Sequence, residues 1–180
     1  HVQRPNNPDT VADMQRAIDA AVQKRGVFTL VFHPHGWIRN DQIVELIDYA
    51  EEKYGRRVKF LNFRECAQRL QRHLLAGQTL RADDGGDNGV RLLDVNHDGF
   101  VDVVIGNDQA RKTRVWLPKE NRFRDFDFPV PLVTKKDAQR VSTGVRFGVL
   151  KQTGEASMLV IGDEHTGGWH FTDKGWQADE

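Results

Sequence analysis

The sequence predicts a two-part chain, with an α/β segment of order αβαβα over residues 1–80 and all-β repeats over residues 81–180. Three observations lead to this prediction. In the first part, runs with helical periodicity alternate with short apolar runs. After Gly77 that periodicity ends, and short β-branched or aromatic runs alternate with turn residues. The second part also repeats itself with a period of about 55 residues.

Composition limits the classes of partner and compartment. The 180 residues suit one ordinary domain or two small ones. Basic and acidic residues balance at 26 each, which argues against a nucleic-acid partner. No apolar run approaches the roughly 20 residues of a membrane span, and the single Cys66 excludes a disulfide within the chain. The chain starts at His1, so we expect either a removed leader or a piece of a longer protein.

The first part is predicted to contain three helices and two strands. Apolar residues at helical spacing and capping residues predict helices from Asp9 to Arg25, from Asn40 or Asp41 to a stop at Gly55, and from Asn62 to Gly77. The runs Val27–Phe32 and Val58–Leu61 are apolar without alternation, which is typical of parallel strands covered on both faces. Two such strands do not form a stable sheet alone. We therefore expect further barrel strands from outside this sequence, or a marginally stable segment.

The second part is predicted to be a series of strands. They are Gly89–Leu93, Phe100–Gly106, Arg114–Leu117, Val130–Val133, Val145–Leu150, Ser157–Ile161 and Gly168–Thr172. Residues 123–128 alternate aromatic and charged side chains, which fits either a half-buried strand or a clasp between blades. Within the repeat, GVRL at 89–92 matches GVRF at 144–147. VIGND at 104–108 matches VIGDE at 160–164 if one residue is inserted. The period suits a β-propeller blade, so about two blades are expected.

One segment, Asp94-Val95-Asn96-His97-Asp98-Gly99-Phe100-Val101-Asp102, carries oxygen-bearing side chains at alternate positions. Calcium takes six to eight oxygen ligands, and a glycine allows the sharp turn that gathers them in one loop. The pattern predicts a calcium site whose ligands are the side chains of Asp94, Asn96, Asp98 and Asp102 and the backbone carbonyl of Phe100. It differs from an EF-hand, because Ile105 stands where that loop needs Glu. The alternative is a metal-free turn rich in Asn and Asp.

The second copy of this segment has lost the oxygen ligands. Val149, Lys151, Thr153 and Ser157 occupy the corresponding positions, and Gly154 alone keeps the turn. We therefore predict no metal in the second copy.

The second part resembles the FG-GAP/VCBS family of β-propeller repeats, as seen in integrin-like and secreted bacterial proteins. The resemblance covers about residues 87–180 and rests on the segment from Asp94 to Gly106 and on Phe147-Gly148-Val149. It implies four-stranded blades with calcium in a loop between two strands, and a surface that binds polysaccharide or protein. Because propellers have four to eight blades, we expect the remaining blades from a parent protein or a neighbouring chain.

The first part resembles the end of the polysaccharide deacetylase family, metal-dependent carbohydrate esterases built on an incomplete (β/α) barrel. The resemblance rests on GVFTLVFHPHGW at residues 26–37 and on the segment 47–60. It implies a strand-end histidine that protonates the leaving amine when a C–N amide bond is cleaved. That residue would be His33, with His35 as the second candidate, and imidazole titrates in a suitable pH range. The alternative is a polar turn packed against Trp37.

The same resemblance implies an Asp-His-His metal triad and an Asp base, and nothing in this sequence matches them. Zinc or another divalent metal would then be bound by parts of the parent outside this chain. A lone acid without a Lewis acid or base does not hydrolyse an amide at a useful rate. We therefore expect the isolated chain to be inactive.

These patterns predict a fragment of a secreted carbohydrate-active protein, located outside the cell or in the periplasm. Its parent would be a polysaccharide N-deacetylase with a calcium-stabilised propeller as binding module. The alternative is a non-catalytic, calcium-dependent adhesion or scaffold module whose barrel part is degenerate.

Overall fold

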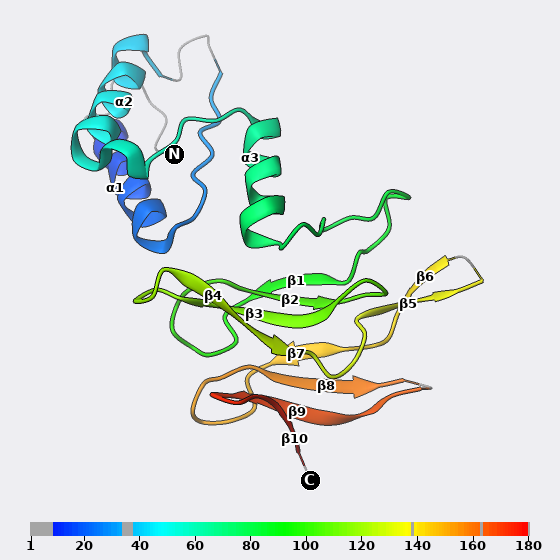
Figure 1. Cartoon of the computed structure of the whole chain (residues 1–180). Coiled ribbons are helices and arrows are strands. Elements are labelled where there is room, and N and C mark those ends of the chain that lie inside the picture. Colours follow the sequence, from blue (N-terminus) through cyan, green and yellow to red (C-terminus); the bar gives the residue numbers. More distant parts are fainter. Residues whose placement is uncertain (1–8, 34–37, 138, 163, 180) are drawn as a thin grey trace. The chain divides into compact units, whose positions relative to one another are not determined.

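The computed structural model describes residues 9–33, 38–137, 139–162 and 164–179. The chain divides into two compact units, His1–Asn62 and Phe63–Glu180. Helices dominate the first unit and antiparallel strands dominate the second (Figure 1). The coarse prediction of a mixed α/β chain with a mainly β C-terminal part is confirmed. No closed barrel occurs in the part of the chain that the structure describes.

The first unit is a pair of helices. Helix α1 spans Asp9–Lys24 and α2 spans Asn40–Tyr54, followed by the 3₁₀ turn η1 at Gly55–Arg57. Helix α2 begins one residue after Arg39, whose backbone N–H donates to the Gln42 side chain at 3.0 Å. The apolar faces predicted from the helical period meet in one cluster, whose buried members are Val11, Met14, Ile18, Ile38, Leu46 and Ala50.

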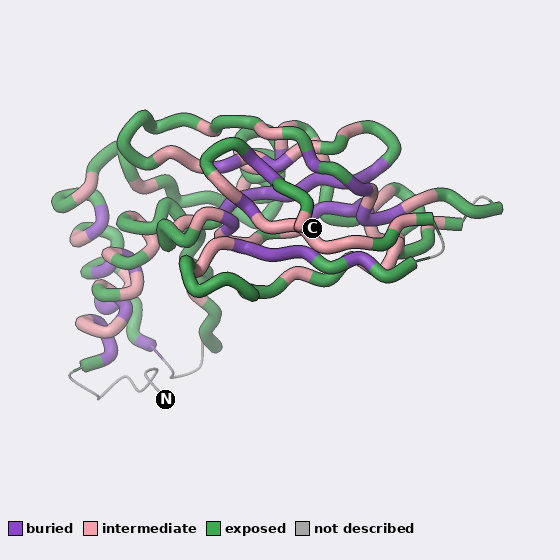
Figure 2. The backbone as a smooth tube through the Cα atoms, turned by 90° about the horizontal axis from the view of Figure 1, so that it is seen from below, coloured by how far each residue is buried: buried purple, intermediate pink, exposed green. Residues whose placement is uncertain are grey.

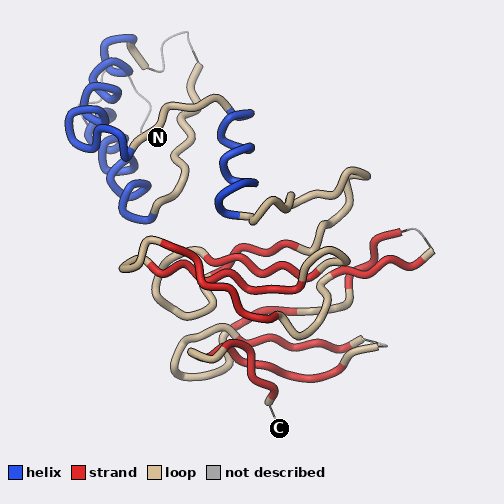
Figure 3. Tube along the Cα trace, viewed as in Figure 1, coloured by secondary structure: helices blue, strands red, loops and turns tan. Residues whose placement is uncertain are grey.

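The two strands predicted in this unit do not form. Residues 26–33 and 58–62 run as loops, drawn in tan in Figure 3. Leu30 and Val58 pack against the helix pair, but Val31 and Phe60 are 66% and 56% exposed. The prediction was wrong because β-branched and aromatic residues favour a strand only where a neighbouring strand can pair with it. In the described part of this unit, no strand pairs with either segment.

The second unit begins with a helical segment that packs on a sheet. Helix α3 spans Phe63–Arg69 and continues as a π-helical turn, η2, at Leu70–Leu74. Leu74 and Leu75 pack against Val103 and Ile105. We call residues 63–75 the capping segment. The boundary between the two units therefore lies before α3, whereas the sequence predicted this helix as part of the first segment.

Two four-stranded antiparallel sheets and a hairpin follow. The first sheet has the order β1-β2-β3-β4, with bounds Val90–Leu93, Asp102–Gly106, Arg111–Leu117 and Arg122–Asp127. The second sheet has the order β10-β9-β8-β7, with bounds Gly175–Ala178, Thr166–Thr172, Ser157–Ile161 and Arg146–Gly148. In the sequence between the two sheets, β5 (Val133–Lys136) and β6 (Gln139–Ser142) form a separate two-stranded hairpin.

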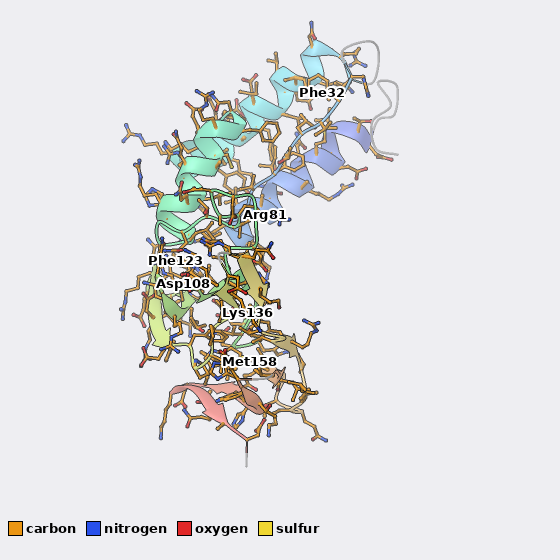
Figure 4. The ribbon with its side chains drawn as sticks, turned by 90° about the vertical axis from the view of Figure 1, so that its right-hand side faces the viewer. Phe32, Arg81, Asp108, Phe123, Lys136 and Met158 are labelled. Carbon is orange, nitrogen blue, oxygen red and sulfur yellow. The ribbon has the colours of Figure 1, made fainter. Side chains whose placement is uncertain are left out.

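The main core lies between the two sheets, where Figure 2 shows buried stretches along the strands. Val104 and Val115 of the first sheet pack in one cluster with Met158, Val160 and Trp176 of the second. Met158, labelled in Figure 4, is 1% exposed. The indole Nε1 of Trp176 donates to the Thr113 hydroxyl at 2.8 Å, so these two buried polar groups satisfy each other.

Strand predictions in this unit succeeded where β-branched runs were clear and failed elsewhere. Residues 123–128, left open between strand and clasp, form most of β4. The run predicted as a strand at Val130–Val133 enters the core as a loop, and β5 begins only at Val133. Strands β6 and β10 were not predicted, because the charged β6 and the four-residue β10 carry little hydrophobic pattern.

The two sheets repeat one pairing register. Leu93 pairs with Asp102 in the first sheet, and Gly148 pairs with Ser157 one repeat later. The same spacing holds at the β2–β3 and β8–β9 pairs, so the inserted residue that the sequence match required is absent from these strands. The match of VIGND to VIGDE was therefore shifted by one residue. A shift of one residue exchanges the two faces of a strand, so Val104 corresponds to Leu159 rather than to Val160.

Candidate functional site

The predicted calcium segment forms the connection between β1 and β2. His97 and Gly99 adopt positive φ angles of 59° and 81°, which turn the chain sharply at the tip. The backbone N–H groups of Asp98 and Gly99 donate to the two carboxylate oxygens of Asp94, at 3.1 and 2.7 Å. Asp94 thus folds the loop back on itself, as Asp side chains do in Asx turns.

Asn96 and Asp98 complete this turn. The Asn96 amide donates to one carboxylate oxygen of Asp98 at 3.0 Å, and the Phe100 N–H donates to the other at 2.9 Å. A carboxylate has about four acceptor sites. One hydrogen bond on each oxygen of Asp94 and Asp98 therefore leaves acceptor capacity for a cation.

Asp102 differs from the other predicted ligands because it is fully buried. Its two carboxylate oxygens accept the backbone N–H of Val95 at 3.0 Å and the N–H of Trp116 at 2.8 Å. The side chain therefore ties the start of the loop to β3. Burial raises the pKa of the Asp102 carboxyl to about 6, and the negative charges of Asp98 and Asp94 act in the same direction.

The loop supplies hard oxygen donors but is not a closed ligand cage. Among the residues that the structure describes, no group of three or more His, Cys, Asp and Glu side chains is arranged to hold a metal ion. Asp94, Asn96 and Asp98 lie within one turn, whereas Asp102 is directed to backbone amides. Carboxylate and amide oxygens are the donor chemistry that calcium selects. The turn that carries them therefore offers the donor chemistry of that ion, and Asp102 ties the base of the loop to backbone N–H groups.

The second repeat keeps a hydrogen bond that ties its loop to the following strand, but it lacks the oxygen ligands. The Leu150 N–H donates to the Ser157 hydroxyl at 3.3 Å, which corresponds to the bond from Val95 to Asp102 one repeat earlier. Gly154 keeps a positive φ of 93°. Ser157 is 1% exposed, so this position is structural in both copies.

A charged cluster that the sequence did not predict lies next to the loop. The His97 ring lies against Gly154 of the second loop, since a Cβ added to Gly154 would fall 2.7 Å from that ring. Nearby, Asp179 binds Lys151 at 2.8 Å and His170 at 2.8 Å. The Lys151 ammonium lowers the pKa of Asp179. The repeat alignment places Lys151 in the second loop, but no sequence signal joins it to the C-terminal Asp179.

Of the two predicted catalytic histidines, the structure describes only His33. His33 ends the extended segment 26–33 and is exposed. His35 lies outside the described residues. Because the strand that was to carry His33 is absent, its imidazole is not positioned by a sheet.

Comparison with protein-family models, with curated proteins and with solved structures gave no significant match. Among the described helices, none is long and apolar enough to cross a membrane. The site is therefore interpreted from its own geometry.

Proposed function

We propose that the second unit is a calcium-stabilised repeat module of the FG-GAP/VCBS propeller type, which binds carbohydrate or protein and is not catalytic by itself. The observation that carries the proposal is the loop at 94–102, where hydrogen bonds gather Asp94, Asn96 and Asp98 into one turn while Asp102 anchors its base. The two meandering four-stranded sheets support the propeller-type assignment.

Calcium would act here as a structural ion. Asp94, Asn96, Asp98 and the Phe100 carbonyl would hold it, and Asp102 would contribute from the base of the loop. The ion would offset the mutual repulsion of the carboxylates, which otherwise lie near one another with no cationic side chain among the predicted ligands. Modules outside the cytoplasm bind calcium weakly, with dissociation constants of about 0.1–1 mM, so the proposal includes an extracellular or periplasmic location.

Thermal unfolding with calcium and with a chelator tests the metal site. A ligand at 100 times its dissociation constant adds about 2.7 kcal/mol to the folded state, which is several degrees in melting temperature. We expect this increase for the unchanged chain and not for Asp98→Ala. The matched control is Thr153→Ala, at the corresponding position of the second repeat, which should keep the full increase.

Two results would count against the metal site. An unchanged melting temperature with calcium would leave the segment 94–102 as a plain turn. An equal loss of the calcium effect in Thr153→Ala and Asp98→Ala would show that general damage to the fold, rather than ligand loss, abolishes the response.

A second candidate function concerns the whole parent protein, a polysaccharide N-deacetylase. It is favoured by the segment 26–33, whose apolar side chains Val27 and Val31 are 56% and 66% exposed and would suit a sheet completed by other strands. His33 at its end would protonate the leaving amine. The metal and the base would come from residues outside this chain, so the isolated chain would remain inactive.

A further inference from the structure

The two sheets contact each other through different faces: one face of the first sheet meets the opposite face of the second. Val104 of β2 points into the core between the sheets, and its neighbours Val103 and Ile105 point to the opposite face. In the second sheet, Met158 and Val160 point into that same core. By the shared register, they correspond to Val103 and Ile105. Each sheet therefore has a front face and a back face, and the front of the first sheet contacts the back of the second.

The back face of the first sheet is covered. Leu74 and Leu75 of the capping segment bury Val103 and Ile105 to 0% exposure. The Arg114 guanidinium donates to the Leu74 carbonyl at 2.8 Å and fastens the segment to β3. Figure 1 shows α3 and β7–β10 on opposite sides of the first sheet.

The front face of the second sheet is open. Leu159 corresponds to Val104 and is 45% exposed, whereas Val104 is fully buried. Leu150, in the loop before β8, corresponds to Val95 and is 74% exposed where Val95 is fully buried. Ile161, on the same face of β8 as Leu159, is 72% exposed. It corresponds to Gly106, where a Cβ would lie 2.8 Å from the backbone N of Leu132, so the linker of a further repeat would have to pass this end of β8 less closely. Grouped large apolar side chains of this kind mark interaction surfaces.

We propose that this front face, defined by Leu150 and Leu159, is the docking surface for a further four-stranded sheet of the same repeat, packed on it as the second sheet packs on Val95 and Val104 of the first. The contact between the two sheets of this chain indicates the occupant. There, the back-face residues Met158 and Val160 share a core with Val95 and Val104, which correspond to Leu150 and Leu159. The inference rests on the propeller-type fold proposed above, but it does not depend on the calcium site.

A second copy of this chain does not offer the matching surface. The back face of its first sheet is covered by the capping segment, and the back face of its second sheet lies in the core. A head-to-tail contact between copies would have to displace Leu74 and Leu75. Docking of a further repeat needs no such displacement, because the open front face meets a free back face.

The test extends the chain at its C-terminus by a second copy of residues 128–180, which carries the linker and the four strands of one further repeat. Leu159→Cys in the original second sheet, combined with Cys66→Ser, provides one reactive thiol at a position that is 45% exposed without the extension and corresponds to the buried Val104. We expect the rate of thiol labelling to fall by about tenfold or more in the extended chain, because the docked sheet covers this position. Val141→Cys, on the β5–β6 hairpin and 42% exposed without the extension, is the control and should label at an unchanged rate.

Three outcomes would overturn the proposal. The first is equal labelling of position 159 with and without a folded extension. The second is an extension that stays unfolded by circular dichroism, because the surface would then not support a further sheet. The third is concentration-dependent protection of position 159 in the chain without the extension, which would identify a second copy as the occupant. Because no arm requires calcium, a failed metal site and a failed docking surface give different results.

Discussion

At the scale of single residues, Asp102 has a structural role that its spacing in the sequence did not predict. It falls in the ligand series with Asp94, Asn96 and Asp98, yet both of its oxygens accept backbone N–H groups in a buried setting. Ser157 repeats one of these bonds without any charge. The position is therefore a brace between a loop and a strand, and its role as a calcium ligand stays a prediction.

This distinction leads to a prediction for Asp102→Ala. Removing the carboxylate leaves the N–H groups of Val95 and Trp116 buried without their acceptor, which costs about 1–3 kcal/mol for an unsatisfied group. We expect that loss of unfolding free energy in urea even with a chelator present. Asp98→Ala, the same change at the exposed tip, should change stability by roughly 0.5 kcal/mol or less under those conditions. Equal losses for the two variants would argue against the brace.

Individual residues also show how much of the candidate site could be predicted from the sequence. Alternating oxygen side chains followed by glycine predicted a sharp turn at 94–102, and the structure forms one. The cluster of Lys151, His170 and Asp179 could not be predicted, because its members come together only when β9 and the C-terminal segment pair. His33 depended on a strand that needs neighbours, so its placement could not follow from its own segment.

At the scale of elements, the sharpest constraint is the approach of the chain before β1 to the end of β2. Gly89 has a φ of +63°, and a Cβ at this position would lie 2.5 Å from the Gly106 carbonyl oxygen. Gly144 repeats the arrangement, with φ of +85° and 2.9 Å to the Ile161 carbonyl oxygen. Both repeats thus begin with a glycine that allows two backbones to come close.

We predict that Gly89→Ala destabilises the second unit more than Gly85→Ala does. Both glycines have positive φ, so both substitutions carry the left-handed penalty of about 1 kcal/mol. A Cβ on Gly85 would meet open space, whereas one on Gly89 would meet backbone that cannot move aside. The difference between the variants should be about 1–3 kcal/mol, as for overpacking, measured by chemical denaturation. Equal effects would show that the close approach relaxes freely.

The elements themselves were predictable to different degrees. The helices α1 and α2 followed from apolar periodicity and end signals, which act locally. Strands β2 and β8 followed from their β-branched runs. Residues 27–32 had the same composition and failed, because a strand is completed by hydrogen bonds to another strand and not by its own side chains.

At the scale of the whole molecule, the two units have hydrophobic clusters with no residue in common. The helix pair of the first unit is held by a polar network as well. Asp19 accepts hydrogen bonds from the hydroxyls of Tyr54 at 2.6 Å and Tyr49 at 2.8 Å, and Lys53 lies 3.0 Å from it. The Tyr54 hydroxyl is the main cause that lowers the pKa of Asp19, with Tyr49 next.

The sign of this shift predicts an acid-sensitive first unit. Because the folded pKa of Asp19 is below its ordinary value of 3.8, its stabilising effect is fully present above that value and is lost as the pH falls through the folded pKa. Asp19→Asn should remove this pH dependence. Both tyrosines of the chain contact Asp19, so tyrosine ring signals in NMR spectra report on this unit. An unchanged acid response in Asp19→Asn would contradict the assignment.

The capping segment makes the two outer faces of the pair of sheets different, because it covers only the face of the first sheet. In the propeller-type arrangement proposed above, closing a ring would require the first sheet to receive a further blade on the face that carries Val103 and Ile105, and in this chain Leu74, Leu75 and the Arg114 hydrogen bond occupy that place. With the capping segment in place, added sheets would instead build an open arc. A closed ring would require the segment to be peeled away first, exposing Val103 and Ile105 to solvent until the last blade arrives.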